Sequence, residues 1–498
     1  MTFRIGSGSF SRRQFLTVQA VAVGAGRVMP RRGPATESRP DFFDGIDEGG
    51  REVMEQVRRD IERIRKGDFK LRVVDANGNP VTGQVRLRHV RHEFRFGGPF
   101  SENPLFLDLF NAGRMNPHWG DIQKAEDGPD GPYQWDRYDK NLNAAHARDI
   151  SMRWHCLIYE EHGSPRWIDA KYRGQPWWKN VPETEEQWWK LIERHLREVS
   201  AHRRPCDGKP LGEFLEFDVI NETGSRMWTN TRLESAGKPP AFPSAHNRHA
   251  NGWHNAARMI TLARQSMPNS RLVALEPWPM GDLNNGMTKR VLRHFSKLFD
   301  RQSDDPLIRQ VAEDPRVLLG CQGHTGAHDR GALSLVRINE GLERFAQFGK
   351  EIAITEYDPP CVAKDKTQEE FERTRLTPEE QAAWSVNFHT LAFSKPYIGE
   401  LMRWCWADGQ SMQRDAGIVL ANHKPKPEYL ALRKLLRETW TTRWEGPTAP
   451  DGSVFFRGFF GTYEVVAAGY RPARVRCHCD SPREIRVELT REPLENEP

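Results

Sequence analysis

The chain has 498 residues, which is enough to bury a large core and exceeds one typical domain. Apolar residues make up 37% and charged residues 28%, the balance of an ordinary globular protein. Its 73 basic and 68 acidic residues leave a net charge of +5, too small an excess to indicate nucleic acid or an anionic membrane as the partner. The seven cysteines lack the spacing of a disulfide framework. A metal clip at Cys477-His478-Cys479 would need a second pair of ligands at suitable spacing, which the sequence lacks, so we expect no metal.

The N-terminus predicts an export signal over residues 1–30. Paired arginines in Ser11-Arg12-Arg13-Gln14-Phe15-Leu16 precede a short apolar stretch, as in twin-arginine signals. A disordered basic leader is the alternative. With the signal, the protein is expected in the periplasm or outside the cell. No run of 18 apolar residues occurs, so we expect no membrane span.

Residues 31–66 predict a linker followed by a charged helix that begins at Arg51 and ends at Lys66. Residues 67–93 read as a β segment, in which alternation on both sides of Asn77-Gly78 is typical of a hairpin. Residues 450–498 are again β-like. An isolated hairpin is only marginally stable, so we expect the two β segments to pack together into one small accessory β unit.

Between residues 94 and 440, short apolar strands alternate with amphipathic helices. We expect the helices to include Glu185–His202 and Trp253–Met267. The expected strands cover residues 94–98, 110–115, 152–159, 214–221, 271–276, 317–322, 352–357 and 401–406. Strand–helix alternation repeated about eight times predicts an α/β protein with a (β/α)8 TIM barrel. In that fold the functional groups lie at the C-terminal ends of the strands.

Two of these strands end in a glutamate. Glu222 follows Asp218-Val219-Ile220-Asn221, and Glu356 lies in Ile352-Ala353-Ile354-Thr355-Glu356. Cleavage of a glycosidic bond uses a pair of carboxyl groups, of which one protonates the leaving oxygen and the other attacks the anomeric carbon. A barrel that gathers its strand ends at one mouth would bring this pair together.

The strand ends carry motifs that resemble those of glycoside hydrolase family 10, the retaining xylanase-type enzymes. Phe217-Asp218-Val219-Ile220-Asn221-Glu222 resembles the family's Trp-Asp-x-x-Asn-Glu motif, and Ile354-Thr355-Glu356-Tyr357-Asp358 resembles its Ile-Thr-Glu-x-Asp motif. Four more matches follow the family's order along the chain. They are Arg153–Tyr159 with Pro165-Arg166-Trp167, Gly320–His324, Trp404–Asp408 and Lys424–Tyr429.

The resemblance implies a role for each matching residue. Glu222 would be the general acid and then the base, and Glu356 the nucleophile that His324 orients. Asn221 would hold the sugar 2-hydroxyl, His155 would bind the same sugar, and Trp404 would form the floor under the ring. Tyr159 and Gln322 complete the expected substrate-binding set. No cofactor is expected, because two carboxyl groups and water suffice. Other histidines are expected to be solvated or to cap backbone groups; they are His89, His92, His118, His162 and His328.

The chain also departs from the family pattern around the neighbouring sugar. The family's Glu-Asn-x-Met-Lys-Trp segment, whose Asn and Lys bind the distal sugar, is replaced by Arg114-Met115-Asn116-Pro117-His118-Trp119. Its Asn-Asp-Tyr is replaced by Glu276-Pro277-Trp278, where Glu276 and Trp278 could form new contacts. A second Trp of the last strand would fall at Met412, and residues 223–251 form a long insertion. These departures predict a divergent substrate site.

The sequence therefore predicts a retaining glycosidase that cleaves β-linked polysaccharide or oligosaccharide, with xylan as the leading substrate. One alternative is a carbohydrate-binding or inactive barrel relative without turnover. Another is a metal-dependent barrel hydrolase, which would need clustered His and Asp at several strand ends. The oligomeric state is left open.

Overall fold

The computed structural model describes residues 48–124, 128–159, 163, 165, 184–213, 216–226, 252–277, 283, 286–324, 334–361, 367–369, 376–410 and 414–492. The predicted export signal and most of the predicted linker lie outside these residues. Among the described residues, no helix combines the length and the apolar composition that crossing a membrane would take.

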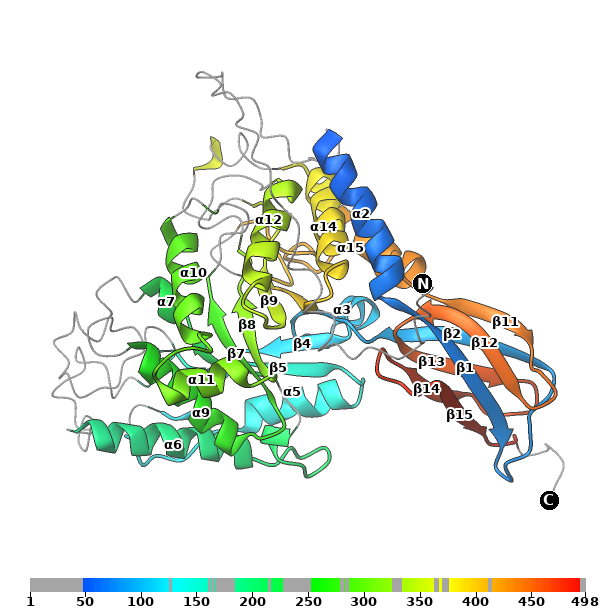
Figure 1. Cartoon of the computed structure of the whole chain (residues 1–498), viewed down its shortest axis with the longest axis horizontal. Helices are drawn as coiled ribbons and strands as arrows, with labels where there is room; N and C mark the ends of the chain where they lie inside the picture. The colour runs from blue at the N-terminus through cyan, green and yellow to red at the C-terminus, as the bar shows by residue number, and fades with distance from the viewer. Residues whose placement is uncertain are drawn as a thin grey trace, which may run out of the picture.

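Eight parallel strands form a closed barrel in the order β10-β3-β4-β5-β6-β7-β8-β9 (Figure 1). They are β3 (Arg95–Pro99), β4 (Ala112–Met115), β5 (Ser151–Ile158), β6 (Glu216–Asn221), β7 (Arg271–Glu276), β8 (Val317–Cys321), β9 (Ile352–Tyr357) and β10 (Ile398–Arg403). The predicted TIM barrel is confirmed. Because all strands run in the same direction, their C-terminal ends meet at one mouth.

Helices alternate with the barrel strands and cover the barrel. The longer ones are α5 (Asp136–His146), α6 (Glu185–Ala201), α9 (Gly252–Ser266), α10 (Gly286–Leu298), α11 (Pro306–Glu313), α12 (Leu335–Ala346), α14 (Pro378–Phe393) and α15 (Pro427–Lys434). Short helices are α3 (Pro104–Leu109), α4 (Trp119–Ile122) and α7 (Thr223–Arg226). Capping boxes begin two of the long helices: Thr184 with Gln187 at α6, and Thr377 with Glu380 at α14.

The last barrel strand lies three residues earlier than the sequence predicted. The expected strand covers residues 401–406, whereas β10 is Ile398–Arg403. The start of this strand was not recognised because it contains Gly399 and Glu400, and both residue types are uncommon in strands. Glu400 is fully buried, however, because it faces the barrel interior and forms ion pairs with Arg95 and Arg153. A buried carboxylate can replace an apolar side chain in a barrel when charged partners surround it.

The N- and C-terminal β segments form one accessory unit, as predicted. Its first sheet has the order β12-β1-β15 and its second the order β11-β2-β13-β14. The strands are β1 (Lys66–Asp75), β2 (Gln84–His92), β11 (Arg443–Pro447), β12 (Ser453–Phe459), β13 (Gly461–Ala467), β14 (Ala473–Cys477) and β15 (Glu484–Leu489). A separate apolar core, which includes Leu71, Val85, Tyr463 and Val465, lies within this unit.

The hairpin predicted over residues 67–93 is wrong in its pairing. A turn does form at the expected place, where Gly78 has φ 82° and the Asp75 carboxylate accepts from the amides of Asn77 and Asn79. However, β1 pairs with β12 and β15, while β2 pairs with β11 and β13. The turn therefore connects two different sheets, because each strand finds its partners in the C-terminal segment.

The accessory unit packs against the end of the barrel where the strands begin, opposite the mouth (Figure 1). Arg65, between α2 (Glu48–Ile64) and β1, donates to the carbonyls of Phe393, Lys395 and Ile398 over 2.6–2.7 Å. Arg91 on β2 donates to the carbonyl of Asn111, just before β4. These contacts fix the accessory unit to the barrel.

His89 and His92 belong to this junction, so the first of the two alternatives predicted for them, a solvated ring, is wrong. Both are buried, with ring centroids 4.5 Å apart, and His92 packs edge-on against Phe393 and Phe459. Burial lowers the pKa of His89 to about 4 and that of His92 well below its usual value. Both rings therefore act as neutral aromatic packing groups at neutral pH.

Arg65→Met should destabilise the fold by about 3 kcal/mol, because several buried carbonyls lose their donor. Arg63→Met is the matched control, since Arg63 lies two residues earlier, in the last turn of α2, is half exposed and pairs with neighbouring Asp60. Its effect should stay below about 0.5 kcal/mol. Thermal or urea unfolding of both variants measures the difference. Equal effects would contradict the role assigned to Arg65.

Candidate active site

The two predicted carboxyl groups lie at the same mouth of the barrel. Glu222 directly follows β6, and Glu356 is the fifth residue of β9. Every residue of both strands is buried. Their surroundings differ: the Glu356 residue is 2% exposed, whereas Glu222 is half-buried. The barrel therefore presents one enclosed and one more accessible carboxyl group at its strand ends.

Glu222 has a strained backbone. Its φ is 57°, in the left-handed region that costs a residue with a side chain roughly 1–2 kcal/mol. Its amide donates to the carbonyl of Leu275 at the end of β7, over 2.9 Å. Strain of this kind persists only where neighbouring contacts fix the conformation, and it occurs often at functional sites.

Gln322 connects the strands that carry the two carboxyl groups. Its Nε2 donates to Oδ1 of Asn221 and to Oε1 of Glu222, each over 3.1 Å. Its carbonyl accepts from the amide of Glu356 over 2.7 Å. Gln322 was predicted as a sugar-binding residue, and the structure places it as a link that orients Asn221 and Glu222.

Glu356 is surrounded by positive groups. Nε2 of His324 lies 3.1 Å from its Oε2, and Nε2 of His155 lies 3.4 Å from its Oε1. Burial alone would raise the pKa of Glu356, but the charges of His155, His324 and Arg114 and the hydrogen bond from His324 outweigh it and lower the pKa to about 2. Glu356 is therefore an ionised carboxylate at neutral pH.

His324 bridges two carboxylates. Its Nδ1 lies 3.0 Å from Oδ2 of Asp358, opposite the contact with Glu356. Burial would lower the pKa of this imidazole, but hydrogen bonds and charge from Asp358 and Glu356 raise it to about 10. His324 is thus a cation at neutral pH that donates from both ring nitrogens. Asp358 was seen only as part of a motif, and the structure assigns it this contact.

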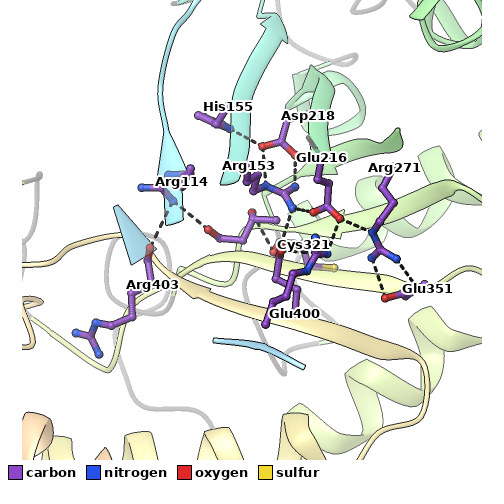
Figure 2. A network of polar contacts seen from close by, with 12 residues as sticks. Arg114, Arg153, His155, Glu216, Asp218, Arg271, Cys321, Glu351, Glu400 and Arg403 are labelled. Carbon is purple, nitrogen blue, oxygen red and sulfur yellow. Dashed lines mark hydrogen bonds and ion pairs between the residues drawn. The ribbon is translucent and has the colours of Figure 1, made fainter. Parts of the chain in front are cut away.

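His155 is the point where a buried ionic network reaches the site (Figure 2). Its Nδ1 lies 2.9 Å from Oδ2 of Asp218, and Arg153 forms a forked contact with the same carboxylate. Arg153 also pairs with Glu216 and Glu400 inside the barrel. Figure 2 shows the network continuing through Glu216 to Arg271 and Glu351, which pair near the start of β7.

The proton distribution in this network follows from its charges. Burial would raise the pKa of Glu216, but Arg95, Arg153 and Arg271 lower it well below its usual value. For Glu400, burial and the charge of Glu216 prevail over the arginines and raise the pKa to about 7. Arg153 has a raised pKa, because its carboxylate partners outweigh its burial. Sequence reasoning missed these residues; charged side chains within apolar strand runs were the available signal.

Trp404 lies directly after β10, where its amide donates to the carbonyl of Tyr357. Its ring stands edge-on to His324, with centroids 5.5 Å apart, and to His155, at 6.1 Å. The guanidinium of Arg114 lies 4.2 Å from the ring centroid and donates to the carbonyls of Thr355 and Trp404. Arg114 thus supports both Trp404 and the strand of Glu356 from behind.

His118, to which the sequence assigned no role, lies beside the site. Its ring centroid is 5.5 Å from that of His155 and 6.1 Å from that of Tyr159. Its Nδ1 is 3.6 Å from Sγ of Cys156. The replaced segment after β4 therefore places an imidazole next to two of the predicted sugar-binding residues. The signal was its position in the altered Arg114–Trp119 motif.

Glu276, whose strand-end position suggested new contacts, contacts the turn that follows Glu222. It is fully buried, and its Oε1 accepts from Oγ1 of Thr223 over 2.5 Å and from the amide of Gly224 over 2.6 Å. Its carboxylate is thus used within the protein. Trp278, Met412 and most of the insertion after Glu222 lie outside the described residues.

Among the described residues, one group has a metal-like arrangement, formed by His146, Cys206 and Asp207. These residues come from the end of α5 and the loop after α6, and Arg204 already holds the Asp207 carboxylate in a forked contact. Cys477 lies in the apolar core of the accessory unit, whereas exposed Cys479 contacts Glu93. The two thiols of the Cys-His-Cys segment therefore face different surroundings.

A family model for glycosyl hydrolase family 10 matches residues 116–435, which include both carboxyl groups and the strands between them. This chain belongs to glycosyl hydrolase family 10. The match supports a glycoside hydrolase with a carbohydrate substrate. It begins after β4, so it leaves out Arg114 and the accessory strands.

Individual relatives of this family 10 chain are distant. The anti-sigma-I factor RsgI6 from Acetivibrio thermocellus is 24% identical over 433 residues, which cover 84% of this chain and 47% of that protein. The chain thus spans about half the length of that curated relative. The structure of GH10 from Paenibacillus barcinonensis is 19% identical with a TM-score of 0.51, and covers 70% of this chain and 96% of that one. Xylanase 10B from Thermotoga petrophila in complex with xylobiose is 16% identical with a TM-score of 0.49, and the match covers 70% of this chain and 95% of that one.

The stability provided by His324 should depend on pH. A histidine whose pKa is raised in the folded state stabilises the fold fully below its unfolded pKa of about 6.5 and loses this contribution as pH rises toward 10. At roughly 1.4 kcal/mol per pKa unit, the maximum is several kcal/mol. His324→Gln should therefore lower the unfolding temperature strongly at pH 6 and much less at pH 10. The exposed His146→Gln serves as control, and parallel curves for both variants would contradict the ion-pair assignment.

Proposed function

We propose that the protein is a retaining β-glycosidase that cleaves β-linked polysaccharide chains internally, in the manner of an endo-β-1,4-xylanase. One observation carries the proposal. An ionised Glu356, held by His324 and His155, lies at the same barrel mouth as Glu222, which is held by Gln322. An ionised carboxylate and a second, more accessible carboxyl group support this proposal, because retaining hydrolysis uses one as nucleophile and the other as acid and base.

In the first step, an oxygen of Glu356 attacks the anomeric carbon as the glycosidic bond breaks. Glu222 gives its proton to the leaving oxygen, so that the departing sugar leaves as a neutral alcohol. The product of this step is a glycosyl ester of Glu356. The low pKa of Glu356 suits this step in two ways, because the group is ionised before attack and is a good leaving group afterwards.

In the second step, water attacks the same carbon and the ester bond to Glu356 breaks. Glu222 accepts the proton from the water, which returns both groups to their starting states. Each step inverts the anomeric carbon, so the product keeps the β configuration. Carboxyl groups about 5–5.5 Å apart are needed for this double displacement.

The sugar beside the nucleophile would contact residues already fixed by the protein. Asn221 uses Oδ1 for Gln322, and no other described residue holds its Nδ2, which would donate to the sugar 2-hydroxyl. His155 would contact the same sugar, with Tyr159 nearby and Trp404 as the floor. A 2-hydroxyl contact of this kind strengthens in the transition state.

Xylan as substrate rests on the ordered motifs shared with xylanase-type enzymes, from Arg153–Tyr159 to Lys424–Tyr429. Polymeric xylan is too large to enter a cell, so the enzyme would have to bind it outside. This is consistent with the proposed twin-arginine signal in residues 1–30. The altered segment Arg114–Trp119 supports a changed preference for the neighbouring sugar, because Met115 and His118 stand where the family has Asn and Lys.

A carbohydrate-binding barrel without turnover is the second candidate. In its favour, the relative from Acetivibrio thermocellus is named an anti-sigma factor, and this name describes a regulatory protein and not an enzyme. The presence of both carboxyl groups, and the arrangement that keeps Glu356 ionised, favour the enzyme.

Glu356→Gln should reduce turnover of every substrate to background, because the amide cannot form the glycosyl ester. Glu222→Ala should lower turnover of natural oligosaccharides by on the order of 10²–10⁴-fold but spare aryl glycosides with good leaving groups, which need little acid assistance. Steady-state kinetics on both substrate types test this. Full activity of Glu356→Gln would refute the mechanism, and activity on neither substrate by the wild type would favour the binding protein.

The first product released from xylan should be the β-anomer, with new reducing ends throughout the polymer. Proton NMR during the first minutes of hydrolysis identifies the anomer, and the fall in viscosity per reducing end distinguishes internal from terminal cleavage. Other β-linked polysaccharides, such as β-glucans, serve as matched polymers. Initial appearance of the α-anomer would contradict the retaining assignment.

A further inference from the structure

Glu276 is a fully buried carboxylate that the proposed reaction does not use. It ends β7, next to the strand that carries Glu222. One oxygen, Oε1, accepts from the Thr223 hydroxyl and from the Gly224 amide. Nε2 of His294, on α10, lies 3.6 Å from this oxygen and 3.2 Å from Oγ1 of Thr223. The carboxylate therefore gathers the two residues that directly follow Glu222.

The packing of this turn leaves little freedom. Thr223, Glu276 and His294 are all buried, with exposures of 2%, 0% and 1%. A side chain at Gly224 would place its Cβ 2.3 Å from the Cβ and Cγ of His294, so only glycine fits there. The backbone after Glu222 is thus held by hydrogen bonds on one side and by the His294 ring on the other.

The same strand end also holds Glu222 from its other side. The amide of Glu222 donates to the carbonyl of Leu275, and the carbonyl of Glu276 accepts from the amide of Gln322. Gln322 in turn donates to the carboxylate of Glu222. The main chain of Glu276 therefore contacts Gln322, and its side chain contacts the residues after Glu222, so Glu276 touches both sets of residues that fix Glu222.

We propose that Glu276, together with Thr223 and His294, is a positioning unit that holds Glu222 in its left-handed conformation and thereby aims its carboxyl group at the glycosidic oxygen. The inference rests on the proposed function, since it concerns the acid and base of that reaction. A left-handed glutamate is unfavourable by itself, so it needs fixed residues on both sides. The family's Asn at this strand end is replaced here by Glu276, whose Oε1 accepts two hydrogen bonds and faces the His294 imidazole.

The test uses Thr223→Val, which keeps the shape of the side chain but removes the hydroxyl, with Thr223→Ser as the conservative rescue and Glu276→Gln as the second variant. For natural oligosaccharides, kcat/KM should fall by on the order of 10²-fold in Thr223→Val and Glu276→Gln. For aryl glycosides with good leaving groups it should change by less than about threefold, because acid assistance matters little there. Thr223→Ser should restore the wild-type ratio.

Val291→Ala is the matched control for a purely structural effect, because Val291 is fully buried on the same helix as His294. It should lower the unfolding temperature and leave the ratio between the two substrates unchanged. Crystal structures of Thr223→Val and Glu276→Gln give a readout that does not depend on turnover, and should show Glu222 outside the left-handed region or its carboxyl group displaced from Gln322.

Two results would overturn the inference. One is an unchanged substrate ratio in Thr223→Val and Glu276→Gln. The other is a crystal structure of both variants in which Glu222 keeps its φ and its contact with Gln322. If the wild type hydrolyses neither substrate, the proposed function fails, and the crystal structures still decide whether Glu276 positions Glu222.

Discussion

The site depends on one guanidinium group in the barrel interior. Arg153 contacts the carboxylates of Glu216, Asp218 and Glu400, and all four side chains are almost completely buried. Buried charges are tolerable only when each has its partners, and removal of one partner from such a group typically costs about 3–5 kcal/mol. Asp218, which Arg153 holds in place, contacts one ring nitrogen of His155, and the other ring nitrogen faces Glu356. The position and charge of the predicted nucleophile are therefore determined from within the core.

The two carboxyl groups differ because their strands deliver them into different surroundings. Glu356 lies within β9, where His155, His324 and Arg114 reach it from neighbouring strands. Glu222 lies one residue beyond β6, where the chain has already turned, and its carboxyl group contacts the neutral amide of Gln322. The barrel thus gives two identical side chains different surroundings.

The sequence was most informative where a residue ends an apolar strand. Glu222, Glu356 and His324 were found in this way, and their strands lie where alternation placed them. The sequence was least informative where a buried charged residue replaces an apolar one. The strand β10 was therefore predicted to begin after Glu400, although it begins at Ile398. Pairing partners far apart in the chain were also hidden: β1 and β2 look like a hairpin, yet each pairs with C-terminal strands. Arg114, His118 and Glu276 lay in altered motifs, whose new contacts only coordinates could give.

The central residues of the site contact one another, whereas the segment Arg114–Trp119 departs from the family pattern. Asn221, Gln322 and His324 each contact another site residue, so replacing one disturbs several. In the segment Arg114–Trp119, Met115 and His118 occupy the two positions whose Asn and Lys bind the distal sugar in the family. There Met115 is buried in the apolar core and cannot bind a sugar hydroxyl, while Arg114 turns inward beneath Trp404. A change of sugar preference can therefore arise at Met115 and His118 without replacing Arg114, which supports Trp404 and the strand of the predicted nucleophile.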